Sequence, residues 1–231
     1  MHTLEELLRA RSVAVVGASA TPGKMGHTIL SNILGGGYDG AVYPINPRER
    51  ELLGLACYPT LTDTPAPAEL VVICVPARLV ADVLRQAGDC GACGAVIISG
   101  GFGEIGNVEA EQALLDIARA SGMRLIGPNC QGFNYTVNRL CASWPRVEAR
   151  GVLGVVSQSG TLGAEIALRA ERDGMGISCF AALGNKLDVN EIDFIDFFRD
   201  DPATRVIVLN VEGLRDGFRE AVTRAAAVKP V

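Results

Sequence analysis

The sequence predicts an α/β fold built from two successive parallel sheets. Short runs rich in Val and Ile alternate with longer amphipathic segments along most of the 231 residues. These runs are too short for helices, and their continuous hydrophobicity is typical of strands buried on both faces. Strands that alternate with helices favour parallel sheets with helical crossovers.

The first half of the chain contains five expected strands separated by three long expected helices. The strands are predicted at residues 12–17, 41–45, 70–75, 95–99 and 124–126, and the helices at 26–34, 79–86 and 108–120. Most strand ends are followed by Gly, Pro or Asn, which terminate regular structure and form turns.

The same alternation restarts after a polar segment with Pro145. Strands are expected at 152–156, 177–182 and 206–211, and helices at 161–172, 191–198 and 216–228. We therefore predict two domains, at residues 1–146 and 147–231. The final "KPV" resembles the opening of a further strand, so the sequence predicts a fragment, or a subunit completed by another polypeptide.

Composition excludes several classes of protein. A net charge of −5 argues against a general nucleic-acid binder, and no stretch reaches the about 20 apolar residues of a membrane span. The N-terminus lacks secretory features, which favours a cytoplasmic location. Cys90 and Cys93 have C-x-x-C spacing, but with no second pair and two histidines in the chain we expect no metal site.

The first expected strand runs into a loop that contains Gly17, Gly23, Lys24 and Gly26. Glycines allow close backbone approach, and free amides at a helix N-terminus favour phosphate. The spacing matches neither G-x-G-x-x-G nor the Walker pattern, since Met25 follows the lysine. The loop therefore predicts a phosphate site, and a tight turn with a solvated lysine is the alternative.

The second strand ends at Asn46, Pro47 and Arg48. Dinucleotide enzymes place an acidic residue near this point for a ribose hydroxyl. An amide and a guanidinium favour a phosphorylated ribose over NAD. An ordinary turn with a surface arginine is equally compatible with the residues.

Three further strand ends in the first half have unusual chemistry. Pro76 closes one strand, residues 99–102 (Ser-Gly-Gly-Phe) close the next, and residues 127–132 (Gly-Pro-Asn-Cys-Gln-Gly) follow the last. Ligands of open α/β sheets bind beyond the carboxyl ends of strands. Their joint occurrence on one edge predicts a pocket.

In the second half, residues 157–161 (Ser-Gln-Ser-Gly-Thr) join a strand to a helix, which predicts a second anion site at a helix N-terminus. A simple N-cap is the alternative. Serine hydrolysis is excluded because G-x-S-x-G is absent and no histidine follows. Asp188 and Glu212 follow the next two strands. Carboxylates beside an anion site repel the anion, so they would require a cationic partner. Alternatively, Asp188 caps a helix and Glu212 is a solvated surface residue.

Taken in order, these motifs resemble the NDP-forming acyl-CoA synthetases, which include ADP-forming acetate–CoA ligase and the alpha subunit of succinyl-CoA synthetase. The resemblance covers essentially the whole chain, through "GAS…PGKMG", "YPINPR", "VPA", "SGGFGE", "GPNCQG", "SQSGTLG", "GNKLDV" and "EGLRDG". It implies a Rossmann-like CoA-binding domain followed by a flavodoxin-like ligase domain. The implied reaction converts acid, CoA and NTP into acyl-CoA, NDP and phosphate through an acyl phosphate and a phosphohistidine.

The resemblance also implies roles for residues that match the family motifs. Asn129 would lie near the CoA thiol and the acyl group, Ser159 and Gly160 would hold the transferable phosphate, and Glu212 would orient the phosphohistidine. Residues implied to contact CoA are Gly17, Ser19, Lys24, Met25, Asn46, Pro47 and Arg48, and those implied to line the pantetheine path are Val75, Pro76, Ser99, Gly101 and Phe102.

The sequence departs from the family pattern in two ways that change the expected function. Gln131 stands where many relatives have Leu or Pro, so the resemblance does not define the preferred acid. Neither His2 nor His27 matches the family's phosphorylated histidine, and the ATP-grasp domain that would carry nucleotide and Mg is missing. We expect a chain that binds CoA and a small carboxylic acid, is inactive alone, and needs an ATP-grasp part in cis or trans, as a possible oligomer.

Two other functions agree with parts of the sequence. The chain could be a CoA-binding regulatory module of a CoA-dependent acyltransferase fusion. It could also be an NADP-dependent oxidoreductase domain that uses Arg48 for the 2′-phosphate.

Overall fold

A computed structural model describes residues 1–231 and contains a five-stranded parallel sheet in its first half. Its strands are β1 (Ser12–Val16), β2 (Ala41–Ile45), β5 (Leu70–Ile73), β6 (Gly94–Ile97) and β7 (Arg124–Ile126). They lie in the order β2-β1-β5-β6-β7, and every neighbouring pair is parallel. The long helices of this half are α2 (Met25–Gly35), α3 (Ala77–Asp89) and α4 (Val108–Ser121). The predicted α/β class and the five predicted strands are confirmed.

Short elements that the sequence analysis did not identify complete this half. Thr3 caps a one-turn helix by accepting a hydrogen bond from the backbone N–H of Glu6 and is part of a capping box. The elements are α1 (Leu4–Leu8), the hairpin β3 (Glu51–Leu52) and β4 (Leu55–Ala56), and the 3₁₀ turns η1 (Leu61–Asp63) and η2 (Gly103–Ile105).

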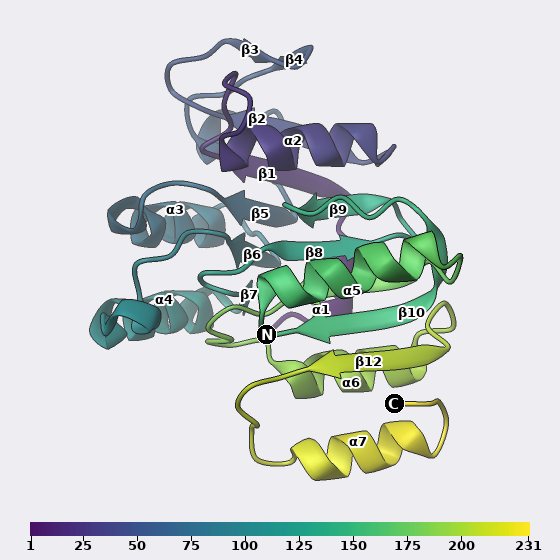
Figure 1. The fold of residues 1–231 in the computed structure, drawn as a ribbon. Helices are drawn as coiled ribbons and strands as arrows, with labels where there is room; N and C mark the ends of the chain where they lie inside the picture. The colour runs from purple at the N-terminus through teal and green to yellow at the C-terminus, as the bar shows by residue number, and fades with distance from the viewer.

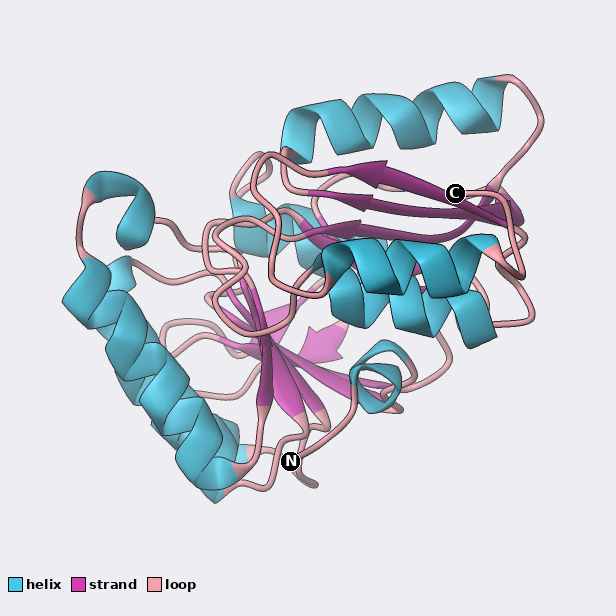
Figure 2. Ribbon diagram, turned by 90° about the horizontal axis from the view of Figure 1, so that it is seen from below, coloured by secondary structure: helices cyan, strands magenta, loops and turns pink.

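Strand β1 lies inside the first sheet and is buried on both faces. Val13 and Val15 belong to one hydrophobic cluster, whereas Ala14 and Val16 belong to another on the opposite face. This alternation follows from the two-residue period of a strand. Helices α3 and α4 cover the second of these faces, and the rest of the molecule lies against the first (Figure 2).

The second sheet has the order β12-β10-β11-β8-β9. Its parallel strands are β10 (Arg150–Ser157), β11 (Ile177–Ala182) and β12 (Val206–Asn210), which confirms the expected alternation. The helices between and after them are α5 (Gly160–Arg172), α6 (Glu191–Asp200) and α7 (Phe218–Ala226). Helix α5 lies on one face of this sheet, and α6 and α7 lie on the other side (Figure 1).

The expectation of a purely parallel second sheet needs correction. The hairpin of β8 (Gly132–Tyr135) and β9 (Leu140–Ser143) extends it, and β8 pairs antiparallel with β11. β9 forms one edge of this sheet, yet all eight residues of the two strands are buried, so other parts of the molecule cover the hairpin. The sheet is therefore mixed, because a short hairpin turn brings β9 back beside β8 without a helical crossover.

The hydrogen-bonded sheets divide between Ile126, the last residue of β7, and Gly132, the first of β8. The domain boundary predicted at residues 146 and 147 lies further along the chain and stays an expectation about independent folding units. The hairpin lies in the sequence between the point where the sheets divide and the predicted domain boundary. It contacts both halves, since β9 contacts α2 and β8 pairs with β11.

The two halves share a hydrophobic core. One cluster of 32 buried residues includes Val13 of β1, Phe133 of β8 and Phe194 of α6. Polar contacts join the same halves: Arg124 Nε donates to Asp188 Oδ2 at 2.8 Å, with both side chains at most 14% exposed. This shared core makes the relative position of the two sheets a property of the fold, which matters for the cleft between them.

Two observations concern the chain as a whole. No helix combines the length and the apolar character that crossing a lipid bilayer would require. Residues 229–231 form no strand, but the carbonyl oxygen of Pro230 accepts a hydrogen bond from the backbone N–H of Ile207 in β12 at 2.9 Å.

Candidate functional site

The strand order of the first sheet reverses at β1, because β2 lies on one side of β1 and β5 on the other. Open α/β sheets bind ligands beyond the strand ends at such a switch point. Gly17 follows β1 with φ of +86°, and a Cβ atom there would lie 2.8 Å from the carbonyl oxygen of Cys74. Glycine is required here, because any side chain would overlap the end of β5.

A cavity of about 700 Å³ opens at this switch point, and we call it the β1–β2 cavity. Lys24 and Arg48 both line it, both are exposed, and neither forms an ion pair. Seven residues that the sequence analysis singled out line this cavity: Gly17, Lys24, Asn46, Pro47, Arg48, Val75 and Pro76. The structure therefore brings the two cations and the glycine loop together around one space.

Asn46 holds the cavity wall in shape. Its Nδ2 donates to the carbonyl oxygen of Ala18 at 2.7 Å, and its Oδ1 accepts from the backbone N–H of Arg48 at 2.9 Å. Ser19 lines neither this cavity nor the next one; its Oγ accepts from the Thr21 N–H at 3.1 Å. Both residues thus organise the loops that carry the exposed cations.

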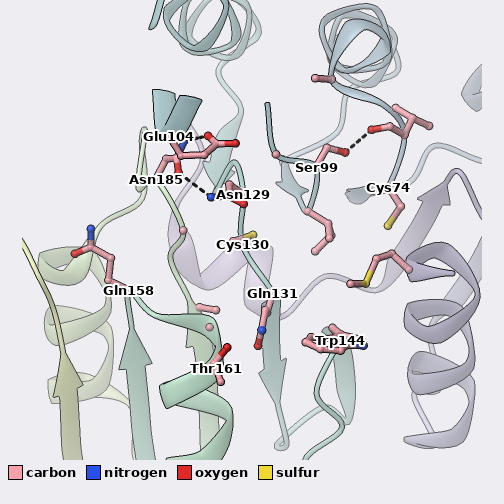
Figure 3. Close-up of a pocket in the computed structure, with 18 of the residues that line it drawn as sticks. Cys74, Ser99, Glu104, Asn129, Cys130, Gln131, Trp144, Gln158, Thr161 and Asn185 are labelled. Atoms are coloured by element: carbon pink, nitrogen blue, oxygen red, sulfur yellow. Dashed lines mark hydrogen bonds between the residues drawn. The ribbon is translucent and has the colours of Figure 1, made fainter. Parts of the chain in front are cut away.

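A second space of about 870 Å³ lies where the carboxyl ends of both sheets converge, and we call it the inter-sheet cleft. Figure 3 shows side chains from both halves facing it. Predicted site residues that line it are Met25, Val75, Pro76, Ser99, Asn129, Gly160 and Glu212. Because Val75 and Pro76 line both spaces, the β1–β2 cavity and the cleft are adjacent.

Besides Ser19, three further predicted site residues line neither space. Phe102 is 2% exposed and packs in the core under α3 and α4. The backbone N–H of Gly101 donates to the carboxylate of Glu104. Ser159 caps α5, since its Oγ accepts from the Leu162 N–H at 3.4 Å.

A hydrogen-bonded network crosses the floor of the cleft. Asn129 Nδ2 donates to Asn185 Oδ1 at 3.3 Å, and Asn185 Nδ2 donates to Glu104 Oε2 at 2.7 Å and Glu111 Oε2 at 2.6 Å. Burial raises the pKa of Glu104, but hydrogen bonds from Gly101 and Asn185 outweigh it, so the net pKa lies below the ordinary value. Asn129, itself at φ of +57°, is thus held in place by the opposite half of the molecule.

Two thiols lie along the same wall, that of the half-buried Cys74 and that of the buried Cys130. Burial raises the pKa of Cys74 to about 12 and that of Cys130 to about 12, so both remain protonated at neutral pH. Cys130 Sγ lies 3.3 Å from the carbonyl oxygen of Ile97, to which it donates. A nucleophilic role for either thiol is therefore disfavoured.

The N-terminus of α5 opens into the cleft opposite this wall. Helix N-termini favour anions, because their first N–H groups lack helical partners and the helix dipole is positive there. Gly160 begins the helix, and a Cβ atom on it would lie 2.5 Å from Cδ of Gln131. Behind the turn, Ser157 Oγ donates to Asn210 Oδ1 at 2.9 Å, which joins the ends of β10 and β12.

Hydrogen bonds to Gln158 hold the loop that carries Glu212. Gln158 Oε1 accepts from the N–H groups of Glu212 at 3.0 Å and Gly213 at 3.2 Å. Lys186 Nζ donates to Glu191 Oε2 at 2.9 Å in a buried ion pair. Burial raises the pKa of Glu191, but hydrogen bonds from Lys186 and the Arg215 N–H hold its net pKa below the ordinary value.

The two carboxylates for which a cationic partner was considered, Asp188 and Glu212, differ in whether they have one. Asp188 pairs with Arg124, whereas Glu212 is exposed to the cleft and forms no ion pair. The chain's two histidines, His2 and His27, line neither space; His27 Nδ1 lies 3.0 Å from the carbonyl oxygen of Ser19.

Sequence reasoning gave no individual role to several residues of the cleft. Trp144, Thr161 and Glu104 line it, and Asn185 and Gln158 organise it. Gln158 and Thr161 stood in the segment of residues 157–161, and Glu104 and Asn185 stood in the motifs "SGGFGE" and "GNKLDV". Trp144, the chain's one tryptophan, stood in no motif. Pro145 was the available signal, because a proline interrupts a strand, but the strand that ends just before Trp144 was not identified.

Comparison with known proteins agrees with this architecture. Residues 11–136 match a family model described as a CoA binding domain, and residues 150–231 match one described as a succinyl-CoA ligase like flavodoxin domain. The alpha subunit of acetate–CoA ligase (ADP-forming) I from Pyrococcus furiosus is 39% identical over 99% of this chain and 52% of that subunit. Acetate–CoA ligase (ADP-forming) from Methanocaldococcus jannaschii is 38% identical over 100% of this chain and 33% of its own length.

A solved structure shows the same fold. The dinucleotide-forming acetyl-coenzyme A synthetase 1 of Ca. Korarchaeum cryptofilum, in complex with phosphate and ADP, is 41% identical with a TM-score of 0.95. The match covers 100% of this chain and 51% of that one, so the chain spans about half the length of such relatives, or less. The chain belongs to the NDP-forming acyl-CoA synthetase family, and it contains that family's CoA-binding domain followed by its succinyl-CoA-ligase-like flavodoxin domain.

Proposed function

We propose that this chain binds coenzyme A with its nucleotide in the β1–β2 cavity and its thiol in the inter-sheet cleft. The observation that carries the proposal is the pair Val75 and Pro76, which line both spaces. Coenzyme A is a long molecule with a polyanionic nucleotide at one end and a thiol at the other. Exposed Lys24 and Arg48 match the anionic end, and the loop of Asn129 lies near the other.

The phosphoryl group would be held at the N-terminus of α5, across the cleft from the thiol. Ser159 and Gly160 leave amides free for an anion, and Glu212 faces the same space with no ion-pair partner. A phosphohistidine that enters the cleft would find in Glu212 a carboxylate to orient its ring. An acyl phosphate formed there would lie between the phosphate site and the thiol.

The proposed reaction is acid + CoA + NTP = acyl-CoA + NDP + phosphate, catalysed together with an ATP-grasp part that binds nucleotide and Mg. Since His2 and His27 line neither space, we propose that the phosphorylated histidine comes from outside these 231 residues. The chain on its own would then bind CoA without turnover. A cytoplasmic location, where CoA and nucleotide occur together, belongs to the same proposal.

Isothermal titration calorimetry of the 231-residue protein with CoA and with NADP tests the binding proposal. We expect saturable binding of CoA and none of NADP. A pantetheine arm can pass Val75 and Pro76 from the β1–β2 cavity into the cleft, whereas the loop after β1 lacks the G-x-G-x-x-G spacing that holds the pyrophosphate of a nicotinamide dinucleotide. Binding of NADP without CoA would overturn it in favour of an oxidoreductase domain. A ligase assay on the protein alone is the second test, and robust turnover would refute the proposed need for an ATP-grasp part.

A further inference from the structure

One side chain in the inter-sheet cleft has an unmatched polar group. Gln131 follows the Asn129 loop and lines the cleft, yet its Oε1 is buried with no hydrogen-bond partner. It is the one buried side-chain polar atom of this kind in the chain. A buried acceptor without a donor is costly, so native proteins supply such groups with a donor from the protein, from ordered water or from a ligand.

Gln131 lies between the two proposed reaction centres. It is two residues from Asn129 on the thiol side, and its amide packs against Gly160 on the phosphate side, where a Cβ atom would lie 2.5 Å from Gln131 Cδ and 2.7 Å from its Nε2. An acyl group that passes from phosphate to thiol must occupy this region. The glycine at position 160 is thus what lets the amide reach the N-terminus of α5.

The side chain of Trp144 lies beside the Gln131 amide. Trp144 and Gln131 are cross-strand neighbours at the open end of the β8–β9 hairpin, since the Trp144 N–H donates to the Gln131 carbonyl oxygen at 2.9 Å. Asn32 Nδ2 holds the same backbone by donating to the Trp144 carbonyl oxygen at 2.8 Å. Trp144 is nevertheless 45% exposed. Its side chain lies beside Gln131 in the cleft (Figure 3), so a fixed backbone presents an apolar surface there.

We infer that Gln131 and Trp144 determine which acid is used, and that they select an acid with an apolar carbon body and a hydroxyl group. This inference rests on the proposed CoA-binding function. A side-chain amide offers an acceptor and a donor side by side, and a hydroxyl group can satisfy both. An ammonium group is disfavoured at this place, because the positive end of the α5 dipole adjoins the amide.

Calorimetry with CoA thioesters tests the inference on the 231-residue protein. The probes are butanoyl-CoA, its 3-hydroxy and 4-hydroxy derivatives, its 3-oxo derivative, and CoA itself. We expect at least one hydroxylated thioester to bind about tenfold more tightly than butanoyl-CoA, the gain of one well-placed hydrogen bond to a buried acceptor. The 3-oxo derivative, which offers an acceptor alone, should not share this gain.

Gln131→Met is the decisive variant, because it keeps the length of the side chain and removes both polar atoms. We expect it to bind CoA as the wild type does and to lose the preference for the hydroxylated thioester. Gln112→Met, on the exposed face of α4, is the matched control and should leave every affinity unchanged. Trp144→Ala should weaken all butanoyl thioesters relative to CoA.

The outcomes separate the two proposals. Tight CoA binding with equal affinity for hydroxylated and plain thioesters overturns the inference and leaves the proposed function standing. A preference for the 3-oxo derivative, or a hydroxyl preference that persists in Gln131→Met, also overturns it. Absence of CoA binding would overturn both.

Discussion

A Cβ atom on Gly17 would lie 2.8 Å from the carbonyl oxygen of Cys74, so the ends of β1 and β5 meet where no side chain fits. The β1–β2 cavity begins at this contact, because Gly17 and the residue after Cys74, Val75, both line it. Close approach of the two backbones therefore sets the shape of the proposed coenzyme site.

Gly17→Ala should destabilise the protein by about 3 kcal/mol, since it combines strain at positive φ with overlap against β5. Gly91→Ala is the control: φ is +78° there and no atom lies within 4 Å of a Cβ, so about 1 kcal/mol is expected. Urea unfolding followed by circular dichroism measures both. Equal losses in the two variants would show that the contact with Cys74 relaxes freely.

Arg48→Ala should weaken CoA binding about tenfold and leave the affinity for dephospho-CoA, which lacks the 3′-phosphate, nearly unchanged. The reason is that a charged hydrogen bond to the ribose phosphate is lost while the rest of the site persists. Calorimetry with the two ligands gives the comparison. Arg169→Ala, an exposed residue of α5 paired with Asp173, is the control. An equal loss for both ligands would place Arg48 away from the 3′-phosphate.

Asn185→Asp should destabilise the protein by about 2 kcal/mol at pH 7, because it removes two donors and sets a third carboxylate beside Glu104 and Glu111. Crowded carboxylates have raised pKa values in the folded state, so the deficit should shrink as pH falls to about 4 and they protonate. Urea unfolding at both pH values checks this. Asn138→Asp, whose amide donates to a backbone carbonyl, is the matched control, and a deficit independent of pH would contradict the electrostatic reason.

Glu191→Gln should cost about 3 kcal/mol at neutral pH, since it leaves the buried ammonium of Lys186 without a counter-charge. The folded-state pKa of Glu191 lies below its ordinary value of 4.5, so the wild-type advantage should be complete above that pH and disappear as pH falls through the folded-state pKa.

Chemical denaturation across pH 3 to 7 follows this difference. The comparison pair is Arg85 and Asp82 on the surface of α3, where Asp82→Asn should change stability by less than about 0.5 kcal/mol. If the wild type and Glu191→Gln lost stability in parallel below pH 4.5, the ion pair would not be the cause.

Much of the fold could be predicted because short stretches of sequence are enough to identify most of its strands. The runs at β5 and β6 are buried at every position and carry no polar side chain, and the same holds for β1 after Ser12, as is typical of strands buried on both faces. Each run is followed by residues that favour turns. Lys24 and Arg48 could be placed on one cavity for the same reason: parallel strands present their carboxyl ends on a single edge.

The hairpin of β8 and β9 was missed for an equally physical reason. Residues 132–135 read Gly-Phe-Asn-Tyr, in which Asn134 is buried and donates to the carbonyl oxygen of Val147 at 2.6 Å. A strand whose polar residue is satisfied by a distant backbone group does not show simple apolar periodicity. Phe102 is a comparable case, since its motif suggested a ligand contact and its ring enters the core.

By itself the sequence determined the alternation of strands and helices, the glycine-lined strand ends and the family, because these follow from short-range propensities and motif order. Only the tertiary structure decided that Gln131 meets Gly160, that Asn185 joins Asn129 to Glu104, and that two cavities connect at Val75 and Pro76. Those contacts join residues far apart in the chain, and they depend on how one shared core packs two sheets against each other, which no local pattern encodes.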